Sequence, residues 1–274
     1  MQSTRTQPEV QDVLSRILHV KQQEVEALHQ QEAELRTRAA DASPTRGLAA
    51  ALRNPGHVQL LAEIKRRSPS AGLIREGADA GSVAQAYELG GAAALSVLTD
   101  SHFFGGDLES LRQARAACQL PVLRKDFIID QLQVWEARAG GADAILLIAR
   151  ALDDAVLHDL LALSAELGMD ALVEAHTGRD VERALDAGVS LLGVNNRDLA
   201  TFSTDLKLSE RLVNQVPPHV TFVAESGIRT PADVDRLGAC GVDAVLVGES
   251  LMRQPDISAA ASALVGRPKR ERLE

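Results

Sequence analysis

Two ionisable residues suited to acid and base chemistry stand at the ends of short apolar runs in this sequence. Lys125 lies near the end of the run Pro121–Phe127, and Glu174 lies near the end of the run Ala171–Ala175. A buried Lys or Glu is costly unless it is paired, so a purely structural sequence would place these types on outer surfaces. A lysine ammonium can serve as a general acid and a carboxylate as a general base. A role of Lys125 and Glu174 in proton transfer is therefore a better interpretation than a purely structural ion pair.

Other polar residues stand at or just beyond the ends of further apolar runs. They are Glu63, Lys65, Thr99, Asn195, Arg197, Glu225 and Ser226. For Glu63 or Glu225 taken alone, a salt bridge at the rim is as good an interpretation as a catalytic role. If the runs are parallel strands of one barrel, these side chains converge on the face where the strands end, which is the catalytic face of such barrels.

Glycines at the ends of the last two apolar runs indicate a binding site for an anion. Gly227 follows Glu225 and Ser226, while Gly248 ends the last apolar run and Glu249 follows it. In a barrel, the loops after the seventh and eighth strands commonly bind phosphate through backbone N–H groups, and glycine permits the close approach. The alternative is that both glycines serve only turn geometry.

The composition narrows the function classes. A formal net charge of −9 argues against a nucleic-acid backbone as the main partner. Cys118 and Cys240 are the only cysteines, too few for a disulfide framework or a four-cysteine zinc site, and they favour a reducing cytoplasm. The N-terminal segment has no apolar run of signal-peptide or membrane-spanning length.

The sequence lacks the common motifs of metal sites, hydrolases and nucleotide-binding loops. No pair of histidines has metal-ligand spacing, and we expect His102 and His176 to have surface or loop roles. Neither a nucleophile-elbow motif nor a nucleotide P-loop motif occurs. The sequence therefore predicts no metal site.

Eight short apolar runs of strand length could position these residues, with amphipathic helical segments between them. The runs are Val58–Lys65, Ala93–Thr99, Pro121–Phe127, Ala144–Ile148, Ala171–Ala175, Leu191–Asn195, Thr221–Ser226 and Ala244–Gly248. The clearest helical segments are Asp153–Leu167, Arg179–Ala187 and Pro231–Ala239. This alternation predicts an α/β fold with a (β/α)8 TIM barrel, and a doubly wound open sheet is the alternative that periodicity alone leaves open.

Residues 1–274 are expected to form one domain, in which residues 1–54 are an N-terminal helical extension that covers the barrel mouth. The range Val10–Leu28 has helical spacing of apolar residues, the polar stretch Arg38–Arg46 is expected to be a loop, and Leu48–Arg53 a short helix. Glycines at three expected helix-to-strand junctions, which suit left-handed helix ends, are Gly91, Gly141 and Gly241.

The segments at the strand ends resemble, in order, those of the indole-3-glycerol-phosphate synthase family. The first is the stretch from Ala62 to Ser70, AEIKRRSPS. The others are SVLTD (Ser96–Asp100), LRKDFI (Leu123–Ile128), LVE (Leu172–Glu174), GVNNRDL (Gly193–Leu199), ESGI (Glu225–Ile228) and VGESLM (Val247–Met252). Seven segments in register make the resemblance specific. Departures are Ala175, where the family often has Val, and Leu132, where an aromatic residue is common.

The resemblance implies a substrate and roles for individual residues. The substrate would be 1-(2-carboxyphenylamino)-1-deoxyribulose 5-phosphate, converted without a cofactor into indole-3-glycerol phosphate, carbon dioxide and water. Lys125 would be the principal general acid and Glu174 would transfer protons in the dehydration. Lys65 would contact the substrate carboxylate or phosphate or assist as an acid, and Glu63 and Asn195 would orient the reacting groups. The implied substrate-binding residues are Ser68, Phe127, Arg197, Glu225 and Ser226, and the implied phosphate-binding residues are Lys65, Ser226, Gly227, Gly248 and Glu249.

Two rival functions use the same barrel. A phosphoribosylanthranilate isomerase would be expected to use a Cys/Asp pair at strand ends, but here the first strand ends in Glu-Ile-Lys. A non-catalytic sensor of a phosphate ligand would be favoured had Lys125 or Glu174 been replaced. We expect a monomer that binds neither nucleic acid nor membrane, and docking to other enzymes of tryptophan synthesis stays open.

Overall fold

The computed structural model describes residues 13–69, 71–198 and 203–272, and the start of the expected first helix, Val10 to Asp12, lies outside them. Eight parallel strands form a closed barrel in the order β1-β10-β9-β8-β7-β6-β5-β4. Their bounds are β1 (Gln59–Ile64), β4 (Ala94–Leu98), β5 (Val122–Lys125), β6 (Ala144–Ile148), β7 (Asp170–Ala175), β8 (Leu191–Asn195), β9 (Thr221–Glu225) and β10 (Ala244–Val247). The predicted TIM barrel and its eight strands are confirmed, and the open sheet is excluded.

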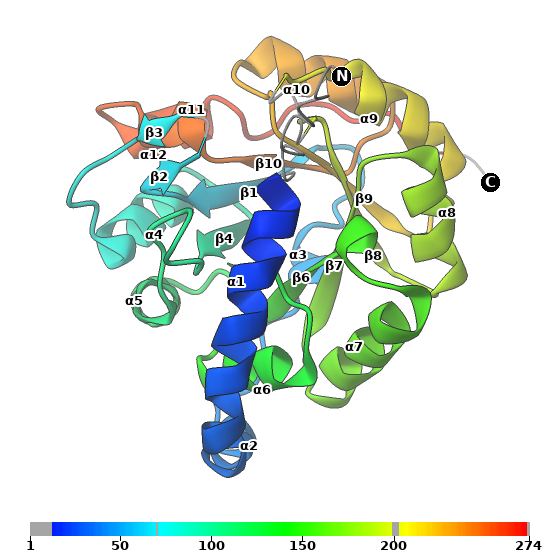
Figure 1. Cartoon of the computed structure of the whole chain (residues 1–274). Helices are drawn as coiled ribbons and strands as arrows, with labels where there is room; N and C mark the ends of the chain where they lie inside the picture. The colour runs from blue at the N-terminus through cyan, green and yellow to red at the C-terminus, as the bar shows by residue number, and fades with distance from the viewer. Residues whose placement is uncertain (1–12, 70, 199–202, 273–274) are drawn as a thin grey trace, which may run out of the picture.

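Helices surround this barrel (Figure 1). Those that follow the first strand are α4 (Ala80–Leu89), α5 (Leu108–Ala117), α6 (Gln131–Ala139), α7 (Asp154–Glu166), α8 (Gly178–Asp186), α9 (Lys207–Leu212), α10 (Pro231–Ala239), α11 (Glu249–Met252) and α12 (Ile257–Ser262), with single 3-10 turns η2 (Ala149–Ala151) and η3 (Val213–Gln215). Several begin with a side-chain cap, such as Asp153 on Val156 N–H of α7, which satisfies an otherwise unpaired donor. Gly91, Gly141 and Gly241 have φ of 82°, 86° and 91°, as expected of left-handed helix ends.

The core has two parts, which follow from the two-residue period of a strand. Outward residues such as Leu60 and Val173 pack under the helices. Inward residues fill the barrel interior with an aliphatic cluster that includes Leu61, Leu123 and Leu172. The residue two positions after an inward leucine also faces inward, nearer the carboxyl end of the strand. That period brings polar residues near the strand ends to the mouth of the barrel.

The N-terminal extension consists of α1 (Val13–Leu28), η1 (His29–Gln31), α2 (Glu32–Ala40) and α3 (Leu48–Ala51). Figure 1 shows α1, in dark blue, running across the barrel. Helix α3 lies at the opposite end, where Ala49 N–H donates to Asp170 Oδ2 at the start of β7 over 2.9 Å. Leu48 and Leu52 complete the interior cluster from that side. Of the described extension, only α1 therefore reaches the barrel mouth. The whole of residues 1–54 was expected to cover the mouth, but among the described residues this holds for α1 alone.

Helix α2 corrects one boundary, because the stretch expected to be a loop from Arg38 is still helical as far as Ala40. The segment is mostly polar, and its helical turns are joined by Arg36–Glu32 and Arg38–Glu34 ion pairs of 2.9 and 3.5 Å. The small hairpin of β2 (Arg67–Ser68) and β3 (Gly72–Leu73) was also not predicted. Among the described residues, no helix has the length and apolar composition needed to cross a membrane.

Candidate active site

A cavity of about 460 Å³ opens at the carboxyl ends of the strands. Its lining contains every residue that the sequence suggested for catalysis, substrate binding or phosphate binding: Glu63, Lys65, Ser68, Lys125, Phe127, Glu174, Asn195, Arg197, Glu225, Ser226, Gly227, Gly248 and Glu249. Helix α1 adds the apolar side chains of Val13, Leu14 and Ile17. The cavity is of the size of a small-molecule site.

Strand periodicity explains how the polar side chains reach this cavity. Lys125 lies two residues after the inward Leu123 of β5, and Glu174 lies two residues after the inward Leu172 of β7. Across the barrel, Asn195 of β8 and Glu225 of β9 are paired in register, so their side chains stand at the same level. The sequence thereby builds a polar layer directly on the apolar barrel interior.

The ammonium of Lys125 lies between two carboxylates. Its Nζ is 3.0 Å from Glu174 Oε2 and 3.2 Å from Glu225 Oε2. Burial opposes the positive charge, but the surrounding carboxylates outweigh it and raise the pKa of Lys125 above its ordinary value. Lys125 therefore stays protonated, and its charge is fixed at the centre of the cavity.

The contact between Lys125 and Glu174 differs from the arrangement expected from sequence, in which the two faced each other across a bound substrate. They touch directly here, although β5 and β7 are separated by β6. Opposite charges in a poorly solvated cavity attract strongly, which accounts for the closed pair. A substrate that reaches Lys125 would replace part of this contact.

The two carboxylates differ in ionisation. Burial disfavours the charge on both, but Lys125 and a hydrogen bond from Asn195 lower the pKa of Glu174 to about 2. For Glu225, burial and the nearby charge of Glu174 outweigh Lys125 and raise its pKa to about 8. Glu225 Oε1 is buried with no hydrogen-bond partner and lies against Gly193, which leaves room for it. At neutral pH, therefore, Glu174 is ionised and Glu225 is mostly protonated, so the two carboxyl groups together carry about one negative charge.

The raised pKa of Glu225 predicts a dependence of stability on pH. The folded protein holds this proton between the ordinary carboxyl pKa and about 8, whereas the unfolded chain has lost it, so this group's stabilising contribution falls as pH rises through that window. Glu225→Gln keeps the shape without the titration. We expect the free energy of unfolding of wild type, relative to Glu225→Gln, to decline from pH 5 to pH 8 in urea titrations. Parallel pH profiles for the two proteins would contradict this.

A second ion pair stands at the end of β1. Lys65 Nζ is 2.5 Å from Glu63 Oε1, and the lysine is the more exposed of the two. The buried hydroxyl of Tyr87 donates to the backbone carbonyl of Glu63 over 3.1 Å and fixes this strand end from the helix side. Lys65 is therefore a partly exposed cation at the rim, paired with a buried carboxylate.

The loops after β9 and β10 lie side by side in the same lining. Ser226 has φ of 66°, and it is the only non-glycine residue with positive φ in the part of the chain that the structure describes. Gly227 follows with φ of 82°. Gly248 lies against Glu63, and a side chain there would collide with that carboxylate. Glu249 turns its carboxylate to Arg253 at 3.0 Å, so the cavity meets this loop mainly through its backbone.

His176 was expected to have a surface or loop role; it lies in the loop directly after β7, but it is not at the surface. Its side chain is only 6% exposed, and Nε2 lies 3.4 Å from Glu174 Oε1. Burial lowers the pKa of His176, so the ring is neutral at neutral pH. Its position directly after the end of β7 is the feature of the sequence that could have indicated a place beside Glu174. His102, in contrast, is exposed as expected.

The barrel also resembles solved structures of distant sequence. One is a thiamine phosphate pyrophosphorylase from Pyrococcus furiosus, with a TM-score of 0.57 at 18% sequence identity, covering 76% of this chain and 93% of that chain. At this identity the likeness shows the fold alone.

Sequence relatives are much closer. Indole-3-glycerol phosphate synthase of Chlorobium chlorochromatii is 50% identical over 242 residues, covering 87% of this chain and 94% of the relative. The enzyme of that name from Rhizorhabdus wittichii is 52% identical over 236 residues, covering 85% of this chain and 89% of the relative. The sequence model described as indole-3-glycerol phosphate synthase matches residues 14–264. The chain belongs to the indole-3-glycerol phosphate synthase family.

Proposed function

We propose that the chain closes the indole ring of 1-(2-carboxyphenylamino)-1-deoxyribulose 5-phosphate, releasing carbon dioxide and water, as a carboxy-lyase of tryptophan biosynthesis. The observation that carries this proposal is the buried Lys125 ammonium held between Glu174 and Glu225 in one cavity. Family membership gives the reaction, and this arrangement supplies the charges that it needs.

Ring closure requires an electrophilic carbonyl. The aromatic carbon that carries the carboxylate attacks the ketone carbon of the sugar chain, and the carbonyl oxygen gains negative charge. Lys125 stabilises that charge and delivers a proton to it. Because its pKa is raised, Lys125 is a weak acid before reaction, so the developing oxyanion must draw the proton. Loss of carbon dioxide then returns the bonding electrons to the ring.

Dehydration requires proton transfer on both sides of the new bond. Glu174 is ionised and adjacent to Lys125, so it can accept the proton lost from the ring system. Because Lys125 gives up its proton in ring closure, the Lys65 ammonium protonates the departing hydroxyl. Lys65 is the other lysine of the cavity, and it can also contact the substrate carboxylate. Asn195 orients Glu174, and Glu63 orients Lys65.

The remaining lining residues suit the two ends of such a substrate. Phosphate would lie at the Ser226–Gly227 and Gly248–Glu249 loops, with Lys65 near it, and the cationic Arg229 and Arg253 also line the cavity. Phe127 and the apolar side chains of α1 suit the aromatic ring and exclude water from it. Ser68 and Arg197 complete the polar rim. Binding energy at the phosphate end would thus orient the reacting carbons.

The direct test is turnover of the carboxyphenylamino-deoxyribulose phosphate, followed by the fluorescence of the indole product. We expect formation of indole-3-glycerol phosphate with no added cofactor. A well-folded protein with no turnover would refute the proposed reaction. Conversion of phosphoribosylanthranilate instead would assign the barrel to the isomerase reaction. A monomer located in the cytoplasm stays a prediction, to be checked by light scattering and by cell fractionation.

A further inference from the structure

Lys21 occupies an unusual place on helix α1. The helix buries Leu14, Ile17, Val25 and Leu28 along one stripe, and Lys21 stands in the middle of that stripe at 1% exposure. Helical spacing would favour an apolar residue at this position. A lysine buried there destabilises the helix contact unless its charge is paired.

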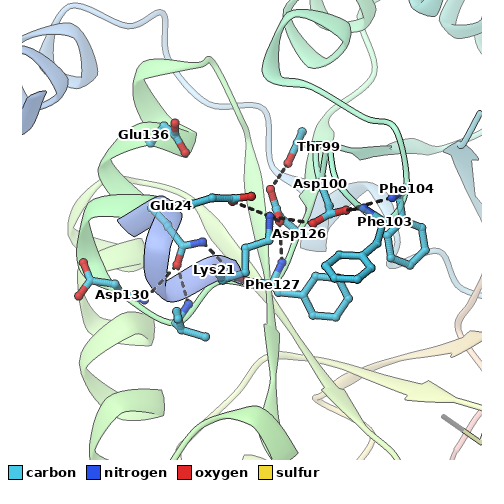
Figure 2. Close-up of polar contacts among 12 residues, drawn as sticks. Lys21, Glu24, Thr99, Asp100, Phe103, Phe104, Asp126, Phe127, Asp130 and Glu136 are labelled. Atoms are coloured by element: carbon cyan, nitrogen blue, oxygen red, sulfur yellow. Dashed lines mark hydrogen bonds and ion pairs between the residues drawn. The ribbon is translucent and has the colours of Figure 1, made fainter. Parts of the chain in front are cut away.

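Three carboxylates pair this lysine (Figure 2). Its Nζ is 2.9 Å from Asp100 Oδ2, 2.9 Å from Asp126 Oδ1 and 2.8 Å from Glu24 Oε2. Asp100 and Asp126 are themselves buried, whereas Glu24 is partly exposed. Burial alone would lower the pKa of Lys21, but these acids outweigh it and raise the pKa. We call Lys21, Glu24, Asp100 and Asp126 the Lys21 cluster.

The two buried aspartates also hold the backbone of aromatic residues. Asp100 Oδ1 accepts from the N–H groups of Phe103 and Phe104 over 2.7 and 3.0 Å. Asp126 Oδ1 accepts from Phe127 N–H over 2.8 Å. Phe104 and Phe127 line the active-site cavity, with ring centroids 6.0 Å apart. We call these two rings the aromatic wall.

The Lys21 cluster therefore connects two parts of the cavity that are far apart in sequence. On one side, Ile17 and Leu14 of the same helix line the cavity. On the other, the aspartates that bind Lys21 fix the loops after β4 and β5, which carry the aromatic wall. Neither loop belongs to the candidate phosphate site, which follows β9 and β10.

We propose that Lys21 is a positioning residue, which docks helix α1 against the aromatic wall and thereby forms the binding site for the aromatic end of the substrate. This inference rests on the proposed function, because it names a determinant of binding for that same substrate. Lys21 acts through Asp100 and Asp126 and does not itself line the cavity. Its removal weakens binding of the aromatic ring and leaves phosphate binding intact.

The test is Lys21→Met, which keeps the length of the side chain without its charge. We expect KM for the carboxyphenylamino-deoxyribulose phosphate to rise about tenfold, with kcat within about threefold of wild type, as for loss of uniform binding. As competitive inhibitors, 2-aminobenzoate should bind about tenfold more weakly to the variant and inorganic phosphate equally well. Lys21→Arg, which keeps the positive charge, should restore much of the lost affinity.

A matched control separates positioning from simple stability. Leu28→Ala opens a cavity on the same helix, where Leu28 packs with Leu35 and Leu132 away from the Lys21 cluster. It should lower Tm without changing the ratio of the two inhibition constants. If Lys21→Met lowers Tm but leaves that ratio unchanged, as Leu28→Ala does, the positioning role is overturned.

A second variant keeps the test decisive if Lys21→Met fails to fold because buried Asp100 loses its cation, whereas Asp126 keeps Arg124 at 3.2 Å. Lys21→Met/Asp100→Asn removes one of the two negative charges and retains an oxygen for the Phe103 and Phe104 N–H groups. It should show the same selective loss of affinity for 2-aminobenzoate, and an equal loss of affinity for both inhibitors would overturn the proposal.

Turnover by wild type is measured in the same series. Its absence refutes the proposed reaction, whereas active wild type with unchanged inhibitor binding in the variants refutes only the role of Lys21.

Discussion

Replacing Lys125 by alanine is expected to lower kcat for indole formation by at least about a hundredfold, the scale of general acid catalysis. Lys125 is the cation that contacts both Glu174 and Glu225, so its removal leaves the developing oxyanion beside the ionised Glu174 without that neighbouring positive charge. The other lysine of the cavity, Lys65, is paired with Glu63 and cannot take this place without breaking that contact. Stopped assays with fluorescence detection measure the loss.

The matched control for this prediction is Lys125→Arg, which keeps the positive charge but exchanges a compact donor for a planar one that holds its protons firmly. If charge alone mattered, Lys125→Arg would retain most of the activity. We expect it to stay well below wild type, although above Lys125→Ala. Circular dichroism must show both variants folded. Near wild-type turnover by Lys125→Ala would contradict the assignment of Lys125 as the general acid.

The barrel and the placement of its polar residues could be predicted from sequence for a physical reason. Buried parallel strands read as short apolar runs, and an inward residue at the end of such a run must face the mouth of the barrel. Lys125 and Glu174 were found in this way, and both line the cavity. The glycine at each left-handed helix end, as at Gly141, marked the return to the next strand.

Other features depend on contacts that no local pattern contains. The pairing of Lys21 with Asp100 and Asp126 joins residues from three separate segments, so its charge reads only as a break in the apolar stripe of α1. The burial of His176 follows from packing around β7 and not from the spacing of histidines. The difference in ionisation between Glu174 and Glu225 arises only when both meet Lys125.

The second large effect is expected from Glu174→Gln. This change keeps the size and the contact with Asn195 but removes the one firmly ionised carboxylate beside Lys125. Because the dehydration needs a proton acceptor, we expect kcat to fall by about a hundredfold or more while KM changes little. Glu225→Gln is the matched control, since it removes the other buried carboxyl from the same lysine. A larger loss of kcat in Glu225→Gln than in Glu174→Gln would exchange the roles of the two residues.

The same variant tests the electrostatic coupling within the pair. Glu174 is one cause of the raised pKa of Glu225, beside burial and Glu63, so removing its charge takes away one opponent of Lys125 and lowers that pKa. The pH-dependent stability difference caused by Glu225→Gln should therefore shrink in the Glu174→Gln background, as a double-mutant cycle of urea titrations between pH 5 and pH 8 would measure. If the difference persists unchanged, burial and Glu63 raise the pKa of Glu225 without Glu174. In that case Glu174 acts on the substrate without setting the charge of its neighbour.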